Sequence, residues 1–209
     1  LKMDFLGLQT LGELDRTIKT LAKRGIVIDL EKIPLDDQQV YKLFGDGSTI
    51  GVFQFESRGM RDNLIRLKPN RLEDLLAMNA LFRPGPMENI PTYIACRHGR
   101  KQPKYLHPSL EPILQETYGV IVYQEQVMRI ATDLAGFSMG RADVLRWAMG
   151  KKKMNLMKGL EKEFIDGCVA NDIKLKIAKS IYDLCEKFAK YGFVKAHAAS
   201  YALIAYRCA

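Results

Sequence analysis

Residues 192–206, with the sequence GFVKAHAASYALIAY, are the most informative stretch of this chain. Their alanine content predicts a helix that begins near His197, and its small side chains would let a bulky, flat ligand approach closely. Lys195 and His197 can neutralise a phosphate group or donate hydrogen bonds to it. Tyr201 follows His197 by four residues, which places both on the same helix face. This combination suits a nucleoside triphosphate.

The chain as a whole is predicted to be mainly α-helical with a few short strands. Apolar residues recur at three- and four-residue steps in segments 10–24, 36–44, 57–67, 71–82, 108–114, 124–135, 138–150, 154–170 and 174–190. Asp36 and Ser57 are expected to cap two of these helices, and Gly25 is expected to end the first. Short strands are expected at residues 1–8 and 52–55, and a strand or a buried extended run is expected at 119–123. The sequence has neither a dinucleotide fingerprint nor a Walker loop, which argues against NAD-binding and P-loop functions.

The charge balance favours polyanionic partners. The chain has 32 Lys and Arg against 24 Asp and Glu, a formal net charge of +8. Such an excess indicates nucleic acid or nucleotides as partners, although a solvated basic surface would give the same balance. The four cysteines are scattered without a CxxC pair, which is typical of a reducing cytosol. No apolar run approaches the roughly 18 residues that a bilayer requires, so no membrane partner is expected.

The two ends of the sequence predict a piece of a longer protein. The chain begins at Leu1 rather than Met and stops at Ala209 within an apolar helical pattern. A charged leader followed by a short apolar core is missing at the start, so no secretion signal is expected.

Two arginines lie next to sequence features that predict rigid local backbone. Arg58 follows Ser57 at a predicted helix start, and Arg83 precedes Pro-Gly-Pro. An arginine on a rigid turn can present its planar fork to phosphate at low entropic cost. Salt bridges to neighbouring acidic residues are the alternative.

A basic loop, residues 97–104 with the sequence RHGRKQPK, is a candidate DNA contact. Its cations could follow a DNA backbone by releasing counterions, without reading base sequence. The cations are Arg97, Arg100, Lys101 and Lys104. A plain solvated loop is the alternative. Cys96, His98 and His107 nearby have irregular spacing and no evident fourth ligand, so zinc is not expected.

Five motifs, in order and in register, resemble the alpha subunit of bacterial DNA polymerase III, the replicative polymerase of family C. They are FQFESRGMR at 53–61, LFRPGPME at 81–88, YGVIVYQEQV at 118–127, AMGKKK at 148–153 and the segment at 192–206. The resemblance implies that residues 1–9 end the palm domain and residues 10–209 form the helical fingers domain. It also implies template-directed transfer of a deoxynucleotide to a primer 3′-hydroxyl.

The resemblance assigns the metal chemistry to Asp4. In the family, the aspartate of the motif Lys-x-Asp-Phe-Leu-Gly-Leu is the third of three carboxylates that hold two Mg²⁺ ions. Lys2 would lie on the same side of a strand, near the phosphates. The Asp-x-Asp motif that supplies the other two carboxylates is missing here, so those ligands are expected outside this chain.

The resemblance also assigns the nucleotide-binding residues. It places the last helix over the incoming nucleotide, where Lys195 would neutralise phosphate, His197 would hydrogen-bond to it and Tyr201 would pack against the sugar. The family usually carries two consecutive arginines where this chain has Arg146 and Trp147. Arg146 is therefore expected to contact phosphate alone, while the tryptophan packs in the core or lies flat on a ring or base. Lys151 is expected at the nucleotide, and Lys152 and Lys153 at the DNA.

The implied partners are primer–template DNA, a dNTP, the remainder of the alpha subunit, and replisome subunits such as the sliding clamp through regions outside this chain. The implied location is the bacterial cytoplasm, at the nucleoid. Alone, the chain is expected to bind nucleotide or DNA without synthesis. One alternative is a non-catalytic helical DNA-binding or subunit-contact module, whose DNA binding would be indifferent to dNTP and to Asp4. Another is a dimer that self-associates through faces normally covered by the missing domains, its C-terminal helix being the contact.

Overall fold

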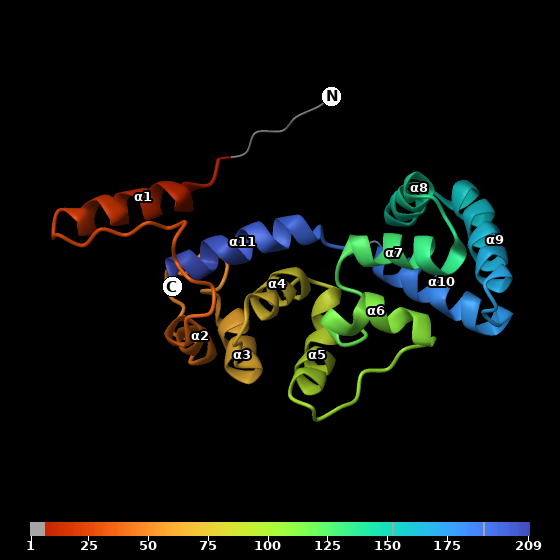
Figure 1. Ribbon diagram of the computed structural model, residues 1–209, viewed down its shortest axis with the longest axis horizontal. Helices are drawn as coiled ribbons and strands as arrows, with labels where there is room; N and C mark the ends of the chain where they lie inside the picture. Colours follow the sequence, from red (N-terminus) through yellow and green to blue (C-terminus); the bar gives the residue numbers. More distant parts are fainter. Residues whose placement is uncertain (1–6, 152, 190) are drawn as a thin grey trace. The chain divides into compact units, whose positions relative to one another are not determined.

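The computed structural model describes residues 7–209 except Lys152 and Lys190. The described chain is helical (Figure 1): α1 (Gln9–Ala22), α2 (Gln38–Gly45), α3 (Arg58–Leu67), α4 (Leu72–Leu81), α5 (Ile90–Arg97), α6 (Glu111–Leu114), α7 (Gln124–Ala135), α8 (Met139–Gly150), α9 (Met154–Ala170), α10 (Leu175–Ala189) and α11 (Lys195–Cys208). Three short 3₁₀ turns, η1 (Pro86–Asn89), η2 (Pro108–Leu110) and η3 (Gln115–Thr117), complete it. The predicted mainly α class is confirmed.

Of the two segments predicted as possible strands within the described residues, 52–55 forms no strand, and 119–123 is mostly buried and forms a single bridge. Residues 52–55 make consecutive turns, in which the N–H of Val52 donates to the carbonyl of Thr49 and the N–H of Phe55 to that of Val52. These local bonds satisfy the backbone without a partner strand. The segment 119–123 makes an isolated parallel bridge, between Tyr123 and Phe193. The predicted strand at 1–8 falls mostly outside the described residues.

The chain divides into two compact units. Unit 1 comprises the residues up to Leu75 together with Ser200–Ala209, and unit 2 comprises Leu76–Ala199. The helices α4 and α11 contribute residues to both units.

In unit 1, the core forms between α2, α3 and the end of α11. Phe44 and Phe55 are fully buried, with ring centroids 5.3 Å apart. Tyr206 donates its hydroxyl to the carbonyl of Pro34 and accepts from the N–H of Asp37, which ties α11 to the start of α2. Asp37, rather than the predicted Asp36, is the N-cap of α2, because its carboxylate accepts from the N–H of Gln39 at 2.8 Å. Ser57 caps α3 as predicted.

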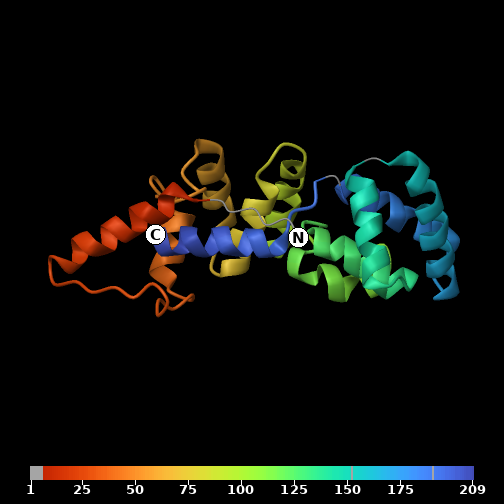
Figure 2. The ribbon, with the colours of Figure 1, turned by 90° about the horizontal axis from the view of Figure 1, so that it is seen from above.

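In unit 2, helices α7, α8, α9 and α10 pack around one core (Figure 2). Their buried residues include Val127, Leu145, Phe164 and Tyr182. Helices α7 and α9 approach closely, since a Cβ at Gly167 would lie 2.1 Å from the carbonyl oxygen of Ala135. This contact lies at the end of α7, and the candidate site is built at the start of the same helix.

The helices of the described residues are all too short or too polar to span a lipid bilayer.

Candidate functional site

The candidate site of unit 2 is built where the start of α7 meets the segment leading into α11. The N–H of Phe193 donates to the carbonyl of Val122 at 3.3 Å, and the N–H of Gln124 donates to the carbonyl of Phe193 at 3.0 Å. The residue before Phe193, Gly192, is close to Gln124, because a Cβ there would lie 3.2 Å from the Gln124 side chain. These contacts join two segments that are far apart in sequence.

Arg83 and His197 both contact the ring of Phe193. The guanidinium carbon of Arg83 lies 4.3 Å from the ring centroid, and the imidazole of His197 meets the ring edge to face at 5.3 Å. Arg83 also donates to the carbonyls of Ala80 and Tyr191, at 2.9 and 2.8 Å. Its half-buried position lowers the pKa of the Arg83 guanidinium through desolvation, but an arginine keeps its charge at neutral pH.

Gly85 allows the turn that carries Arg83 to approach this segment. Its φ is +99°, in the region that favours glycine, and a Cβ would lie 2.7 Å from the ring of Tyr191. The Arg-Pro-Gly-Pro turn therefore brings Arg83 to the ring of Phe193.

Lys195 is held at two of its atoms by carboxylates. Its ammonium pairs with Glu116 at 2.6 Å and lies 5.6 Å from the ring centroid of Tyr123. Its backbone N–H, at the first position of α11, donates to both oxygens of Glu125, at 3.0 and 3.1 Å. Both acidic residues lie in the segment that precedes or starts α7.

Arg146 reaches the same place from α8. Its guanidinium pairs with Asp143 at 2.8 Å and donates to the side-chain oxygen of Gln124 at 3.3 Å. Trp147 beside it is 43% exposed, so the alternative that this residue packs in the core is wrong. We call Arg83, Arg146, Lys195 and His197 the basic cluster. Arg83 and His197 contact Phe193, Arg146 contacts Gln124, and Lys195 contacts the neighbouring residues Tyr123 and Glu125.

The remaining predicted residues of unit 2 lie on its surface. Lys151 and Lys153 are exposed and follow α8, while Lys152 lies outside the described residues. In the basic loop, Arg100, Lys101 and Lys104 are exposed and Arg97 is half-buried at the end of α5. The N–H groups of Arg100 and Lys101 both donate to the carbonyl of Ala95, which turns the loop tightly.

Of the predicted residues that the structure describes, Arg58 and Tyr201 belong to unit 1. Arg58 is the exposed first residue of α3, and Tyr201 packs against Phe53 with ring centroids 5.1 Å apart. Asp4 and Lys2 lie outside the described residues.

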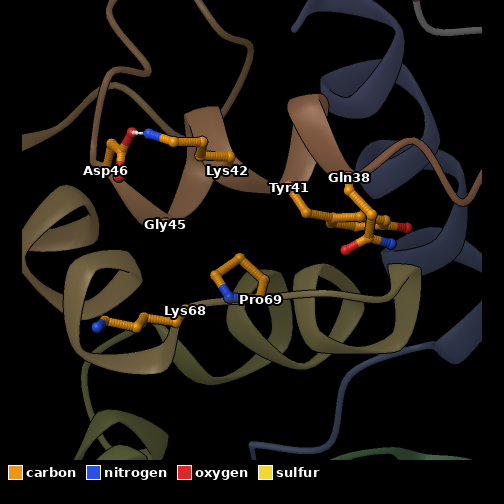
Figure 3. A pocket seen from close by; sticks show the side chains of 7 residues that line it. All are labelled: Gln38, Tyr41, Lys42, Gly45, Asp46, Lys68 and Pro69. Carbon is orange, nitrogen blue, oxygen red and sulfur yellow. Dashed lines mark hydrogen bonds and ion pairs between the residues drawn. The ribbon is translucent and has the colours of Figure 1, made fainter.

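Unit 1 also has a pocket of about 270 Å³ (Figure 3). Lys42 and Asp46, joined by an ion pair, line one side of it, and Lys68 and Pro69 line the opposite side. The predicted site residues do not line this pocket.

Four site residues were missed by the sequence analysis: Glu116, Gln124, Glu125 and Phe193. An acidic residue in the first turn of a helix is ordinary, so Glu125 gave no separate signal. Among the described residues, no three His, Cys, Asp or Glu side chains gather closely enough to hold a metal ion.

The basic cluster thus brings two arginines, a lysine and a histidine together in the helical unit 2, between the start of α7 and the segment that leads into α11. The comparisons with known proteins identify the family. The family described as "Bacterial DNA polymerase III alpha subunit finger domain" matches residues 10–172. The chain belongs to the family of bacterial DNA polymerase III alpha subunits.

The relatives named DNA polymerase III subunit alpha support this assignment along the whole chain. That of Rickettsia prowazekii (strain Madrid E) is 56% identical over 209 residues, which is 100% of this chain and 18% of the relative. That of Caulobacter vibrioides (strain NA1000 / CB15N) is 53% identical over 208 residues, covering 100% and 18%. That of Staphylococcus aureus (strain COL) is 52% identical over 207 residues, covering 99% and 19%. The chain thus spans less than a fifth of the length of these relatives.

Proposed function

We propose that this chain supplies the incoming-nucleotide site of a bacterial DNA-directed DNA polymerase, with residues 1–9 ending the palm and residues 10–209 forming the fingers. In the reaction, the primer 3′-hydroxyl loses its proton and its oxygen bonds to the α-phosphorus of a dNTP. The bond between the α-phosphorus and the bridging oxygen breaks, and pyrophosphate leaves. The observation that supports this function is the basic cluster, which draws on three separate segments of the chain.

The cluster has the chemistry that a triphosphate requires. A phosphoryl transfer site works mainly by positioning the substrate and neutralising its charge. Arg83 is preoriented by two backbone carbonyls and the Phe193 ring, so it would lose little freedom on binding phosphate. Lys195 would exchange its partner Glu116 for a phosphate oxygen, and Arg146 would contribute its fork from α8.

The other predicted nucleotide contacts complete this proposal. Lys151 would reach the triphosphate from the end of α8, Arg58 would contact phosphate from the start of α3, and Lys2 would lie beside Asp4. Tyr201 would pack against the sugar, where its bulk would disfavour a 2′-hydroxyl.

Metal binding is proposed for Asp4 alone. Two Mg²⁺ ions, when bound, would supply charge neutralisation at the reacting phosphates. The described residues form no metal-binding group and Asp4 lies outside them, so we derive no step of the reaction through Mg²⁺. The other two carboxylates are proposed to come from the rest of the alpha subunit.

DNA contact is proposed for the basic loop, with Arg97, Arg100, Lys101 and Lys104, and for Lys152 and Lys153 after α8. Exposed cations of this kind bind the phosphate backbone through counterion release. The partners would be primer–template DNA, the remainder of the alpha subunit, and the sliding clamp through regions outside this chain. The complex would work in the bacterial cytoplasm, at the nucleoid.

Primer extension with the full-length alpha subunit and Mg²⁺ tests the proposal. Asp4→Asn should reduce extension by orders of magnitude while folding and primer binding remain intact. The double variant Lys195→Ala/His197→Ala should raise the KM for dNTP, because phosphate contacts would be lost. If both variants extend like the wild type, the nucleotide-site proposal is wrong and a non-catalytic DNA-binding module takes its place.

A further inference from the structure

We infer that Glu125 is a positioning residue, which holds the first turn of α11 so that Lys195 and His197 face the incoming nucleotide. The inference rests on the function proposed above. Glu125 lies on the first turn of α7, and both of its carboxylate oxygens accept from the backbone N–H of Lys195, at 3.0 and 3.1 Å. A side chain of one helix thus binds the first N–H of another.

The turn that carries Glu125 is itself fixed. The next residue, Gln126, is buried, and its side-chain oxygen accepts from the N–H groups of Val122 and Tyr123 at 2.8 and 3.0 Å. Its side-chain nitrogen donates to the hydroxyl of Thr117 at 2.8 Å. Because Gln126 locks the start of α7 from inside, Glu125 projects from a rigid base toward α11.

The contact between Glu125 and Lys195 lies at the start of α11, in the turn that carries the nucleotide-binding side chains. The first N–H groups of a helix have no partner within the helix, and a helix end without a cap frays. Lys195 and His197 both lie in the first turn of α11. Losing the acceptor at Glu125 would therefore release both side chains from their fixed directions, while the helices that form the core of unit 2 stay packed.

The charge of Glu125 disfavours triphosphate binding, whereas its hydrogen bonds favour it. A carboxylate beside the basic cluster repels a triphosphate, whereas its oxygens orient the residues that bind it. Glutamine keeps one acceptor oxygen and removes the charge, and alanine removes both. The two substitutions therefore separate positioning from electrostatics.

The test measures steady-state dNTP incorporation by the full-length alpha subunit on primed DNA with Mg²⁺. We expect Glu125→Ala to raise the KM for dNTP about tenfold, the lower end of what losing one charge-assisted hydrogen bond implies. We expect kcat to change less than KM, because saturating nucleotide orders the turn. Glu125→Gln should restore a KM at or below that of the wild type.

Two further variants serve as controls for this measurement. Glu163→Ala removes the same charge from unit 2 and breaks a contact with Arg141, at 3.0 Å, that takes no part in the basic cluster, so its KM should stay unchanged. Lys195→Ala should raise KM, and if it does not, the proposed nucleotide site fails and the inference with it. If Lys195→Ala raises KM while Glu125→Ala leaves KM unchanged or lowers it, the site stands and the positioning role is overturned.

Discussion

In the proposed site, Lys195 must give up an ion pair within the protein before it can bind a phosphate group. Its ammonium is paired with Glu116 at 2.6 Å, and a phosphate oxygen would have to replace that carboxylate. Glu116→Gln should therefore lower the KM for dNTP, by up to about fivefold, since partly exposed ion pairs contribute about 1 kcal/mol or less. Steady-state primer extension by the full-length subunit measures the change.

The matched control for this prediction is Glu111→Gln, which removes an exposed carboxylate from the start of α6, a few residues before Glu116. It should leave KM as in the wild type. A raised KM in Glu116→Gln would mean that Glu116 holds Lys195 in its binding position rather than competing for it.

The cations of the candidate site could be predicted from the sequence alone. The acidic groups that contact them could not. Lys195, His197 and Arg83 stood out because each is a basic residue beside a helix start or a rigid turn. Glu125 and Glu116 lie 70 and 79 residues from Lys195 along the chain, and their contacts exist only once α7 and α11 have met. Local spacing carries no information about such a pairing.

At the scale of helices, α9 approaches α7 very closely in unit 2. A Cβ at Gly167 would lie 2.1 Å from the carbonyl oxygen of Ala135, and backbone cannot yield as a flexible side chain does. Gly167→Ala should therefore reduce the free energy of unfolding by about 3 kcal/mol, the cost of overpacking a close helix contact. Urea unfolding followed by circular dichroism measures this loss.

Gly159 provides the control on the same helix. A Cβ there has nothing within 4 Å, so Gly159→Ala should stabilise the chain by up to about 1 kcal/mol through helix propensity alone. If the two substitutions have equal effects on stability, the contact between α7 and α9 does not limit the size of residue 167.

The helices were predictable because their signals are local. Ser57 and Ser138 accept hydrogen bonds from the first turns of α3 and α8, and Gly25 takes a positive φ after α1. The expected strand at 52–55 failed because a short apolar run is equally compatible with a buried turn, and the sequence offers no partner strand to decide between them. In the folded chain, tertiary packing buries Val52 and Phe55, and the segment forms turns.

At the scale of the whole chain, two buried thiols predict how stability depends on pH. Burial raises the pKa of Cys168 to about 11 and that of Cys185 to about 12, in the second case with help from the neighbouring Cys168. The folded state therefore favours the neutral thiols. Their contribution is complete below pH 9.0, the ordinary pKa of a thiol, and is lost as the pH rises toward these two values.

Urea unfolding under reducing conditions between pH 8 and pH 11 measures this dependence. Above about pH 9, each thiol should reduce the free energy of unfolding by up to about 1.4 kcal/mol per pH unit. The variant Cys168→Ala/Cys185→Ala should show a shallower decline, although it is less stable at pH 8. Parallel curves for the two proteins would contradict the prediction.

The net charge of the chain and the position of its exposed cations lead to a prediction about DNA affinity. If the basic loop contacts the DNA backbone, each lost cation should reduce the slope of log K against log salt concentration by about 0.9. The variant Arg100→Ala/Lys101→Ala/Lys104→Ala should thus bind duplex DNA more weakly at low salt, with a slope shallower by up to about 2.7.

The control variant Lys158→Ala/Lys162→Ala/Lys176→Ala removes the same charge from exposed positions of α9 and α10 and should keep the wild-type slope. Fluorescence anisotropy over a salt series, with the full-length subunit, decides between the two. Equal losses in both variants would mean that the excess positive charge attracts DNA as a whole and that the loop makes no particular contact.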